Sequence, residues 1–286
     1  MRRVSICFII IISALLSCKK SNQVVRKSDL PDSTAIDVAY GTAAAQKMDV
    51  YLPAGRTTSS TPFIVTVHGG GWTGGDKGEF NAIISRLQTM LPGYAFFNIN
   101  YRLFDGSTNQ YPAQEEDVKL ALNFILNKSA EYNISNKLVM MGASAGGQLA
   151  LLQAYKYDQP IKAVAAVSFY GPTDMVEFYN NPPSPALQPS LLALFGTSPE
   201  QNLWAYQQAS AAFFVSSKTP PTLLLHGNLD HLVPVAQSQL LKNKLQSAGV
   251  ANELVIYPNE GHGWVGASLE DSYNHIQSFL QAHVKP

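Results

Sequence analysis

From Phe63 to the C-terminus, short apolar runs typical of strands alternate with longer segments of helical periodicity. Continuous apolar runs are typical of strands that are buried on both faces of a sheet. This alternation predicts an α/β fold in which helices cover both faces of a mostly parallel central sheet. The expected strands are 63–71, 94–102, 137–142, 161–171, 222–227 and 252–259, and the expected helices are 79–91, 113–132, 146–157, 235–249 and 268–284.

Two regions depart from this alternation. Residues 33–41 and 46–53 alternate apolar and polar side chains around a glycine-containing connection, which predicts an antiparallel N-terminal hairpin at a sheet edge. Residues 172–220, called the insert below, contain a proline-rich stretch and two short helix-like pieces, 190–196 and 199–214. Because long connections at the C-terminal edge of a parallel sheet often carry function, we expect the insert to form a partial lid or a pocket wall.

The first residues, "MRRVSICFIIIISALLSC", are typical of a secretory signal peptide, with two arginines before an apolar run. The run 6–16 is too short to span a bilayer comfortably. Leu15-Leu16-Ser17-Cys18 resembles the lipobox of bacterial lipoproteins, although Leu16 stands where a small residue is usual. The resemblance implies cleavage before Cys18 and lipidation of that cysteine. An ordinary secreted protein with an incidental cysteine is the alternative.

We therefore expect a lipoprotein signal peptide (1–17), a flexible tether (18–33) and one folded domain (34–286) that includes the insert. The lipid would anchor the protein to a membrane of the bacterial cell envelope, in the periplasm or at the cell surface. Both cysteines, Cys7 and Cys18, precede the domain, so the domain can contain no disulfide. The sequence does not predict the oligomeric state.

The charge pattern argues against one class of partner. Of the 286 residues only 14% are charged, and acids and bases balance to a formal net charge of zero. No run of lysine and arginine is present, so nothing in the sequence indicates nucleic-acid binding.

The motif G-x-S-x-G occurs once, at Gly142 to Gly146, directly after an expected strand and directly before an expected helix. A sharp turn between strand and helix crowds the backbone, so the residues two before and two after the serine must be nearly free of side chain. The turn projects the Ser144 hydroxyl above the sheet edge, with the helix N-terminus below it. This context favours a nucleophile over a chance serine in a glycine-rich connection.

A serine hydroxyl needs a base and an orienting acid to become a nucleophile near neutral pH. Asp230 follows the strand 222–227, and His262 lies in a glycine-flanked loop after the last strand. We expect Asp230 to hold the imidazole and His262 to exchange the proton of Ser144.

Other side chains compete for these roles. His231 neighbours Asp230, but adjacent side chains on an extended backbone point apart. His226 ends a strand and is assigned a structural place, and His68 belongs to another motif. Asp174 also follows a strand, whereas Glu260 is too close in sequence to His262 to reach back easily.

A glycine-rich run, "HGGGW" (68–72), follows the strand that begins at Phe63. Bare N–H groups in such a loop can approach a carbonyl oxygen that becomes an oxyanion, and we expect Gly70, Gly71 and Ala145 to supply them. No G-K-[ST] ending follows and the spacing does not fit a dinucleotide fingerprint, so phosphate binding is not indicated.

Together these motifs resemble the α/β-hydrolase superfamily, specifically the HGGG-type esterase/lipase branch with its hormone-sensitive-lipase-like carboxylesterases and feruloyl or acetyl-xylan esterase-like proteins. The resemblance extends from Ile36 to the C-terminus and includes "NINYRL", "YPAQEEDVKLAL" and "FYGPTDM". Ala143 replaces an acidic residue of many lipase-like members, and the N-terminal helical cap is shorter. Both departures favour the polysaccharide-esterase side.

The resemblance implies a serine carboxylic-ester hydrolase that works through an acyl-enzyme on short-chain or carbohydrate-linked acetyl or feruloyl esters. No C-x-x-C, H-E-x-x-H or acidic calcium loop is present, so no metal or organic cofactor is expected. An amidase or peptidase of the same fold and a non-catalytic glycan-binding protein remain alternatives. Tyr101, Asp117 and Asp174 receive no catalytic role. Four aromatic residues are either pocket walls or core: Trp72, Phe80, Tyr170 and Trp204.

Overall fold

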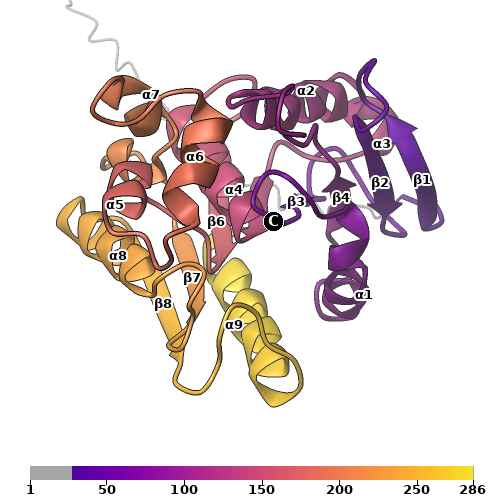
Figure 1. Cartoon of the computed structure of the whole chain (residues 1–286). Helices are drawn as coiled ribbons and strands as arrows, with labels where there is room; N and C mark the ends of the chain where they lie inside the picture. Colours follow the sequence, from indigo (N-terminus) through magenta and orange to yellow (C-terminus); the bar gives the residue numbers. More distant parts are fainter. Residues whose placement is uncertain (1–27, 286) are drawn as a thin grey trace, which may run out of the picture.

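The computed structural model describes residues 28–285, which build one eight-stranded sheet at the centre of the molecule (Figure 1). Its spatial order is β1-β2-β4-β3-β5-β6-β7-β8. The strands from β4 to β8 in this order run parallel, whereas β2 is antiparallel to both β4 and β1. The strands are β1 (Ser33–Ala39), β2 (Lys47–Leu52), β3 (Phe63–Val67), β4 (Ala95–Ile99), β5 (Leu138–Ala143), β6 (Ala163–Phe169), β7 (Thr222–Gly227) and β8 (Asn252–Tyr257). The predicted fold class, including the antiparallel hairpin, is confirmed.

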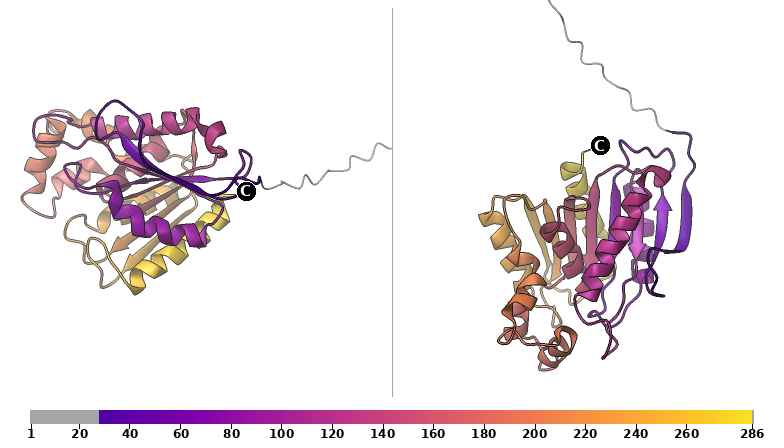
Figure 2. Two further views of the ribbon diagram at one scale, coloured as in Figure 1. Left: turned by 90° about the vertical axis from the view of Figure 1, so that its right-hand side faces the viewer. Right: turned by 90° about the horizontal axis from the view of Figure 1, so that it is seen from above.

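Helices cover both faces of this sheet, as Figure 2 shows in its left view. Helices α2, α4 and α8 pack on one face, and α1 and α9 pack on the other. The helical segments of the described chain are η1 (Lys77–Phe80), α1 (Asn81–Met90), α2 (Ala113–Asn127), α3 (Ser129–Tyr132), α4 (Ala145–Lys156), α5 (Met175–Asn180), α6 (Leu187–Phe195), α7 (Leu203–Gln208), η2 (Ala211–Phe213), α8 (Ala236–Ser247) and α9 (Ala267–His283).

Helix α4 is the most enclosed of these helices. Every residue from Ala145 to Ala154 is buried, because the sheet covers one side of the helix and the insert covers the other. Gly147 permits this depth, since a Cβ there would lie 2.7 Å from Ser168 Oγ and 3.1 Å from Gly171 Cα. The helix N-terminus is thereby held directly at the carboxyl edge of β5.

The helices of the insert lie at other positions than the sequence predicts. Helix α5 was not expected, and α6 begins at Leu187, inside the proline-rich stretch. Pro189 is tolerated because it lies in the first turn, where a backbone N–H has no intrahelical acceptor. The expected helix 199–214 is divided into α7 and η2 near Ser210, whose hydroxyl donates to the carbonyl of Tyr206 and accepts from the N–H of Met175.

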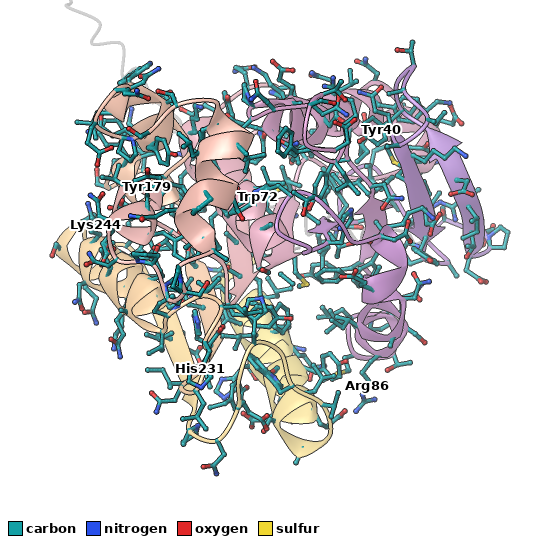
Figure 3. All side chains as sticks on the ribbon, in the orientation of Figure 1. Tyr40, Trp72, Arg86, Tyr179, His231 and Lys244 are labelled. Atoms are coloured by element: carbon teal, nitrogen blue, oxygen red, sulfur yellow. The ribbon has the colours of Figure 1, made fainter. Side chains whose placement is uncertain are left out.

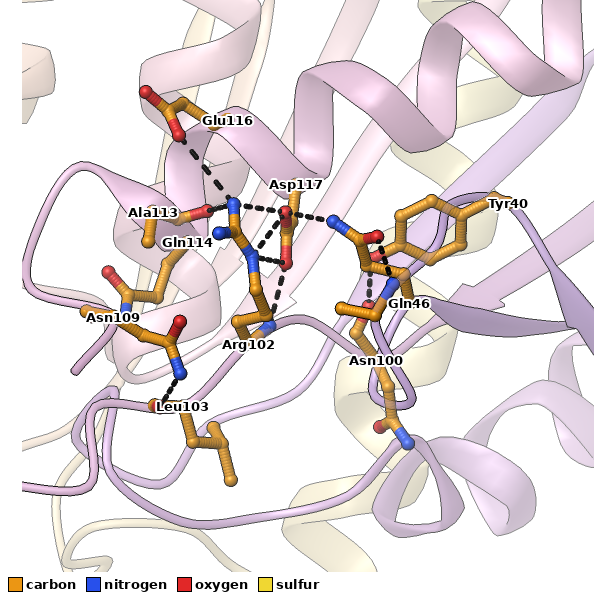
Figure 4. A network of polar contacts seen from close by, with 11 residues as sticks. Tyr40, Gln46, Asn100, Arg102, Leu103, Asn109, Ala113, Gln114, Glu116 and Asp117 are labelled. Carbon is orange, nitrogen blue, oxygen red and sulfur yellow. Dashed lines mark hydrogen bonds and ion pairs between the residues drawn. The ribbon is translucent and has the colours of Figure 1, made fainter.

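A buried polar network fastens the N-terminal hairpin to α2 (Figure 4). Asp117 is fully buried and accepts hydrogen bonds from the backbone N–H of Arg102 (2.8 Å), from its guanidinium Nη2 (2.8 Å) and from Gln46 Nε2 (2.7 Å). Tyr40 adds a bond from its hydroxyl to the carbonyl of Asn100. Asp117 therefore has a structural place, as expected.

The chain start is described only from Ser28. The hydroxyl of Ser28 donates to the carbonyl of Arg56 (2.6 Å), and the N–H of Gly55 donates to the carbonyl of Leu30 (2.8 Å), so this end of the expected tether lies against the domain. The expected signal peptide, Cys18 and the rest of the tether lie outside the described residues. Within 28–285, the helices are too short or too polar to cross a membrane.

Candidate active site

Ser144 stands at a sharp turn between β5 and α4. Its φ of 53° is unusual for a residue with a side chain, and such strain is often found at functional sites. A Cβ on Gly142 would lie 2.1 Å from the carbonyl oxygen of Gly146, and one on Gly146 would lie 2.1 Å from the carbonyl oxygen of Val67. The turn therefore requires glycine at both positions, as the spacing of the motif predicts.

Three loops at the C-terminal edge of the sheet bring the expected nucleophile, base and acid together. His262 Nε2 lies 2.9 Å from Ser144 Oγ, and His262 Nδ1 lies 2.8 Å from Asp230 Oδ2. Ser144 follows β5, Asp230 follows β7, and His262 follows β8. The geometry assigns Nδ1 as the donor to the carboxylate, which leaves Nε2 free to accept the serine proton.

The carboxylate of Asp230 is buried and has several donors. Its Oδ1 accepts from the backbone N–H groups of Leu232 (2.8 Å) and Val233 (2.9 Å), and its Oδ2 lies 3.3 Å from His226 Nε2. Burial alone would raise the pKa of Asp230, but hydrogen bonds from His226, His262 and Val233 together hold that pKa well below its usual range. Asp230 is therefore ionised at neutral pH.

His226 lies closer to the site than the sequence indicates. It is fully buried in β7, where Nε2 donates to the carbonyl of Val233 (2.8 Å) and Nδ1 pairs with Ser238 Oγ (2.7 Å). Its place is structural, as expected, but it also supports the carboxylate of Asp230. Its position four residues before Asp230 was the only sequence signal for this contact.

The glycine-rich loop faces Ser144 across the turn. Gly70 and Gly71 have φ values of 105° and 58°, which are accessible to glycine at little cost. Ala145 is the first residue of α4, so its N–H has no acceptor within the helix. Gly70, Gly71, Ser144 and Ala145 line one cavity, so the residues that are expected to supply the oxyanion donors lie beside Ser144.

The loop is held from below by two side chains. Tyr101 is buried and its hydroxyl donates to the carbonyl oxygens of His68 (3.0 Å) and Gly69 (3.2 Å). Its ring stacks on the imidazole of His68 at 4.3 Å. Burial lowers the pKa of His68, although the hydrogen bond to the Gly69 carbonyl partly opposes this shift. His68 therefore supports the loop and does not act as the base.

The other candidates for the base and the acid lie away from Ser144 or have structural contacts. His231 is exposed at the periphery of the molecule (Figure 3). Asp174 caps α5 by accepting from the N–H groups of Val176 and Glu177, both at 3.1 Å. Glu260 accepts from the hydroxyl of Ser268.

The cavity above Ser144 has a volume of about 410 Å³. Of the four aromatic candidates, Trp72 and Tyr170 line it. Phe80 is instead buried core beneath α1 and α9, and Trp204 is 62% exposed on the insert. Several further lining residues were not predicted, among them Phe178 and Leu187 of the insert and Glu79 of η1.

The insert therefore supplies part of the cavity wall, through Phe178 of α5 and Leu187 of α6. Within residues 28–285, no three His, Cys, Asp or Glu side chains gather so that they could hold a metal ion.

Comparison with known proteins gives one family match, to BD-FAE over residues 48–245. The probable carboxylic ester hydrolase LipM of Mycobacterium tuberculosis is 30% identical over 236 residues, which are 77% of this chain and 53% of LipM. The chain spans between 53% and 63% of the length of three mycobacterial relatives of this kind.

Solved structures share the fold. An acetyl ester-xyloside bifunctional hydrolase from Caldicellulosiruptor lactoaceticus is 26% identical with a TM-score of 0.69, and the match covers 92% of this chain and 98% of that one. A truncated carbohydrate esterase from gut microbiota is 24% identical with a TM-score of 0.72, covering 90% and 98% respectively.

Proposed function

Because the chain belongs to the BD-FAE family, we propose that it is a serine carboxylic-ester hydrolase that works through an acyl-enzyme on Ser144. The observation that carries this proposal is the continuous chain of contacts from Ser144 Oγ through His262 to Asp230, at 2.9 and 2.8 Å. Hydrogen-bonded contacts of this kind allow a neutral hydroxyl to lose its proton as it attacks.

In the acylation half-reaction, Ser144 Oγ attacks the ester carbonyl carbon while His262 Nε2 takes the hydroxyl proton. The carbonyl oxygen becomes an oxyanion and is stabilised by the N–H groups of Gly70, Gly71 and Ala145, with the N-terminus of α4 adding a favourable dipole. His262 then gives its proton to the leaving oxygen, the carbon–oxygen bond breaks, and the alcohol departs.

In the second half-reaction, water replaces the alcohol. His262 takes a proton from the water as its oxygen attacks the acyl carbon, and later returns that proton to Ser144 Oγ as the carboxylic acid leaves. Asp230 keeps the imidazole in the tautomer with the proton on Nδ1 and stabilises the imidazolium that forms in both steps. No other group is required for this cycle.

The cavity walls favour a short or aromatic acyl group. Trp72, Phe178, Leu187 and Leu232 give an apolar wall in a cavity of limited size. The names of two structural relatives, an acetyl ester-xyloside bifunctional hydrolase and a carbohydrate esterase, support a glycan-linked acetyl ester. Acetyl and feruloyl groups on glycans are therefore the proposed substrates.

The proposed location is the bacterial cell envelope, with Cys18 as the lipidated N-terminal residue of the mature protein. The support is the apolar run 6–16 and the Leu-Leu-Ser-Cys sequence that follows it. In a bacterial host, the full chain should fractionate with membranes and require detergent for release, and Cys18→Ser should abolish labelling by a radioactive fatty acid. Absence of labelling in the parent chain would contradict the anchor.

The activity is tested by hydrolysis of acetyl, butyryl, feruloyl and long-chain aryl esters, with the matched anilides alongside. Ser144→Ala should lower kcat by at least about 10³-fold on any ester that the parent hydrolyses. Ser59→Ala is the control, because Ser59 is exposed in the loop before β3 and should keep the parent rate. A fluorophosphonate probe should label the parent and spare Ser144→Ala.

Two results would contradict this proposal. Hydrolysis of anilides in preference to esters would favour an amidase or peptidase. No turnover of any substrate, together with no labelling by the probe, would favour a non-catalytic binding protein.

A further inference from the structure

The two walls of the cavity belong to opposite faces of the sheet and differ in chemistry. Trp72 and Phe178 belong to the apolar layer that contains α4, and Leu187 packs against that layer. Across the cavity, Tyr170 packs against the layer of α1 and α9, and Glu79 lies on η1, directly before Phe80 of that layer. One wall is therefore apolar, and the other carries a carboxylate and a phenol.

A capping box at the start of η1 holds the Glu79 side chain in position. Its carboxylate accepts from the backbone N–H of Asp76 (3.3 Å), and the Asp76 carboxylate accepts from the N–H of Gly78 (2.7 Å). Glu79 Oε1 also lies 3.2 Å from the place that a Cβ on Gly75 would occupy, beside the glycine-rich loop. The side chain is exposed, and among the described residues that line the cavity there is no lysine or arginine to neutralise it.

Tyr170 follows β6 and lies against the catalytic imidazole. Its φ is 39°, which is strained for a tyrosine, and its ring centroid is 4.5 Å from that of His262. Burial, together with the negative charges of Asp230 and Glu79, raises the pKa of Tyr170 to about 12. The phenol therefore stays protonated at neutral pH and remains a hydrogen-bond donor on a residue that lines the cavity.

The direction of proton transfer indicates which half of an ester lies against the wall that contains Glu79 and Tyr170. His262 must deliver its proton to the leaving oxygen, so the alcohol lies on the side of the imidazole. Tyr170 touches that imidazole, and Glu79 lines the same cavity, near enough for its charge to act on the Tyr170 phenol. The acyl group then faces Trp72, Phe178 and Leu187.

We propose that Glu79 and Tyr170 form an alcohol subsite that binds a neutral, polyhydroxylated leaving group, such as an uncharged glycosyl unit, and disfavours anionic ones. A carboxylate accepts hydrogen bonds from two neighbouring hydroxyl groups, and a phenol can donate to a third oxygen. The same unneutralised carboxylate repels a uronate. This subsite deepens the proposed esterase function and rests on it.

The test compares three acetate esters with different alcohols: 4-nitrophenol, methyl β-xyloside and methyl glucuronoside. Glu79→Gln retains the capping box, because glutamine also serves at this position. The quantity compared is kcat/KM for the xyloside acetate divided by kcat/KM for the aryl acetate. We expect Glu79→Gln to lower this ratio about tenfold, mainly through a higher KM for the xyloside acetate. For the glucuronoside acetate we expect the corresponding ratio to rise about threefold or more, since the repulsion is removed.

Two further variants complete the design. Tyr170→Phe should lower the xyloside-to-aryl ratio about threefold without improving the glucuronoside ester. Glu131→Gln, an exposed change on α3, is the matched control and should leave all three rates at the parent values.

Unchanged ratios in Glu79→Gln, with the aryl ester still hydrolysed, would overturn the subsite while leaving the esterase function standing. Parallel changes for the xyloside and glucuronoside acetates in Glu79→Gln would overturn the preference for a neutral alcohol. No hydrolysis of any ester by the parent would overturn the proposed function and the subsite together.

Discussion

The indole Nε1 of Trp72 donates a hydrogen bond to Oε1 of Gln148 over 3.0 Å, and both side chains are buried. Nε2 of Gln148 donates in turn to the carbonyl of Ala209 over 2.8 Å. One side chain of α4 therefore joins the glycine-rich loop to the insert. Because Gly70 and Gly71 directly precede Trp72, the position of the proposed oxyanion donors depends on this link.

Gln148→Leu should lower both stability and activity. The change keeps the volume but leaves the indole N–H and the Ala209 carbonyl without partners, so the free energy of unfolding should fall by about 2–4 kcal/mol. Displaced oxyanion donors should lower kcat about tenfold. Urea denaturation and ester hydrolysis measure the two effects.

Gln239→Leu is the matched control for Gln148→Leu, because Gln239 is exposed on α8 and should leave both quantities near the parent values. Parent-like stability and kcat in Gln148→Leu would show that the link does not position the loop.

Asp117 should matter for stability through the network of Figure 4. Its side chain is 1% exposed and pairs with the guanidinium of Arg102. Asp117→Asn removes the charge while keeping the shape, and we expect it to lower the free energy of unfolding by about 2–3 kcal/mol. Glu116 is the weaker partner of Arg102: its side chain is 66% exposed, and its carboxylate lies 3.6 Å from the guanidinium. Glu116→Gln should therefore lower the free energy of unfolding by less than about 0.5 kcal/mol. Equal costs in the two variants would contradict the importance of burial here.

Much of this architecture could be predicted, because its sequence signals are local. Each parallel strand from β3 to β7 is buried along all or nearly all of its length, so it appears in the sequence as an apolar run bounded by loops. The turn at Ser144 was equally visible, because close backbone approaches exclude side chains at Gly142 and Gly146 and so determine the motif itself. Ser144 and His262 are 118 positions apart in the sequence. Their contact could be predicted only because both residues follow strands of the same sheet.

The insert, Trp72 and Tyr170 were expected at the cavity, but the other lining side chains could not be predicted, because they depend on how distant segments pack. Phe80 and Glu79 are neighbours in sequence, yet one is buried beneath α1 and the other faces the cavity. Helix α5 was missed because its six residues are too few to show a clear period, and it is stabilised by the Asp174 cap and by burial of Phe178. Propensity alone gives a short segment of this kind little preference for helix.

The pH dependence of stability should contain a contribution from His68. Burial lowers the folded-state pKa of His68 below its ordinary value of 6.5, so below that pH the unfolded chain binds the proton more readily than the folded protein. Stability should therefore be greatest above pH 6.5 and fall as the pH drops towards the folded-state pKa, by at most about 1.4 kcal/mol per pH unit from this group.

Urea unfolding of the parent and of His68→Asn at several values between pH 7.5 and 5.5 would measure this contribution. Asparagine can still donate to the Gly69 carbonyl but does not titrate, so the slope should be smaller in the variant. His231→Asn, an exposed change, should retain the parent slope. Parallel profiles for the parent and His68→Asn would contradict the assignment.

A strict requirement for glycine is at Gly146, in the first turn of α4. A Cβ there would lie 2.1 Å from the carbonyl oxygen of Val67 and 2.3 Å from that of His68, and backbone atoms cannot rotate away as side chains can. Gly146→Ala should therefore push α4 away from β3, lower the free energy of unfolding by about 3 kcal/mol or more, and displace Ser144 from His262. Gly93→Ala is the matched control, because a Cβ at Gly93 meets nothing within 4 Å, and its stability should be within about 1 kcal/mol of the parent. Denaturation midpoints and ester turnover of the two variants measure these effects. Parent-like values of both quantities in Gly146→Ala would contradict the close approach of α4 to β3.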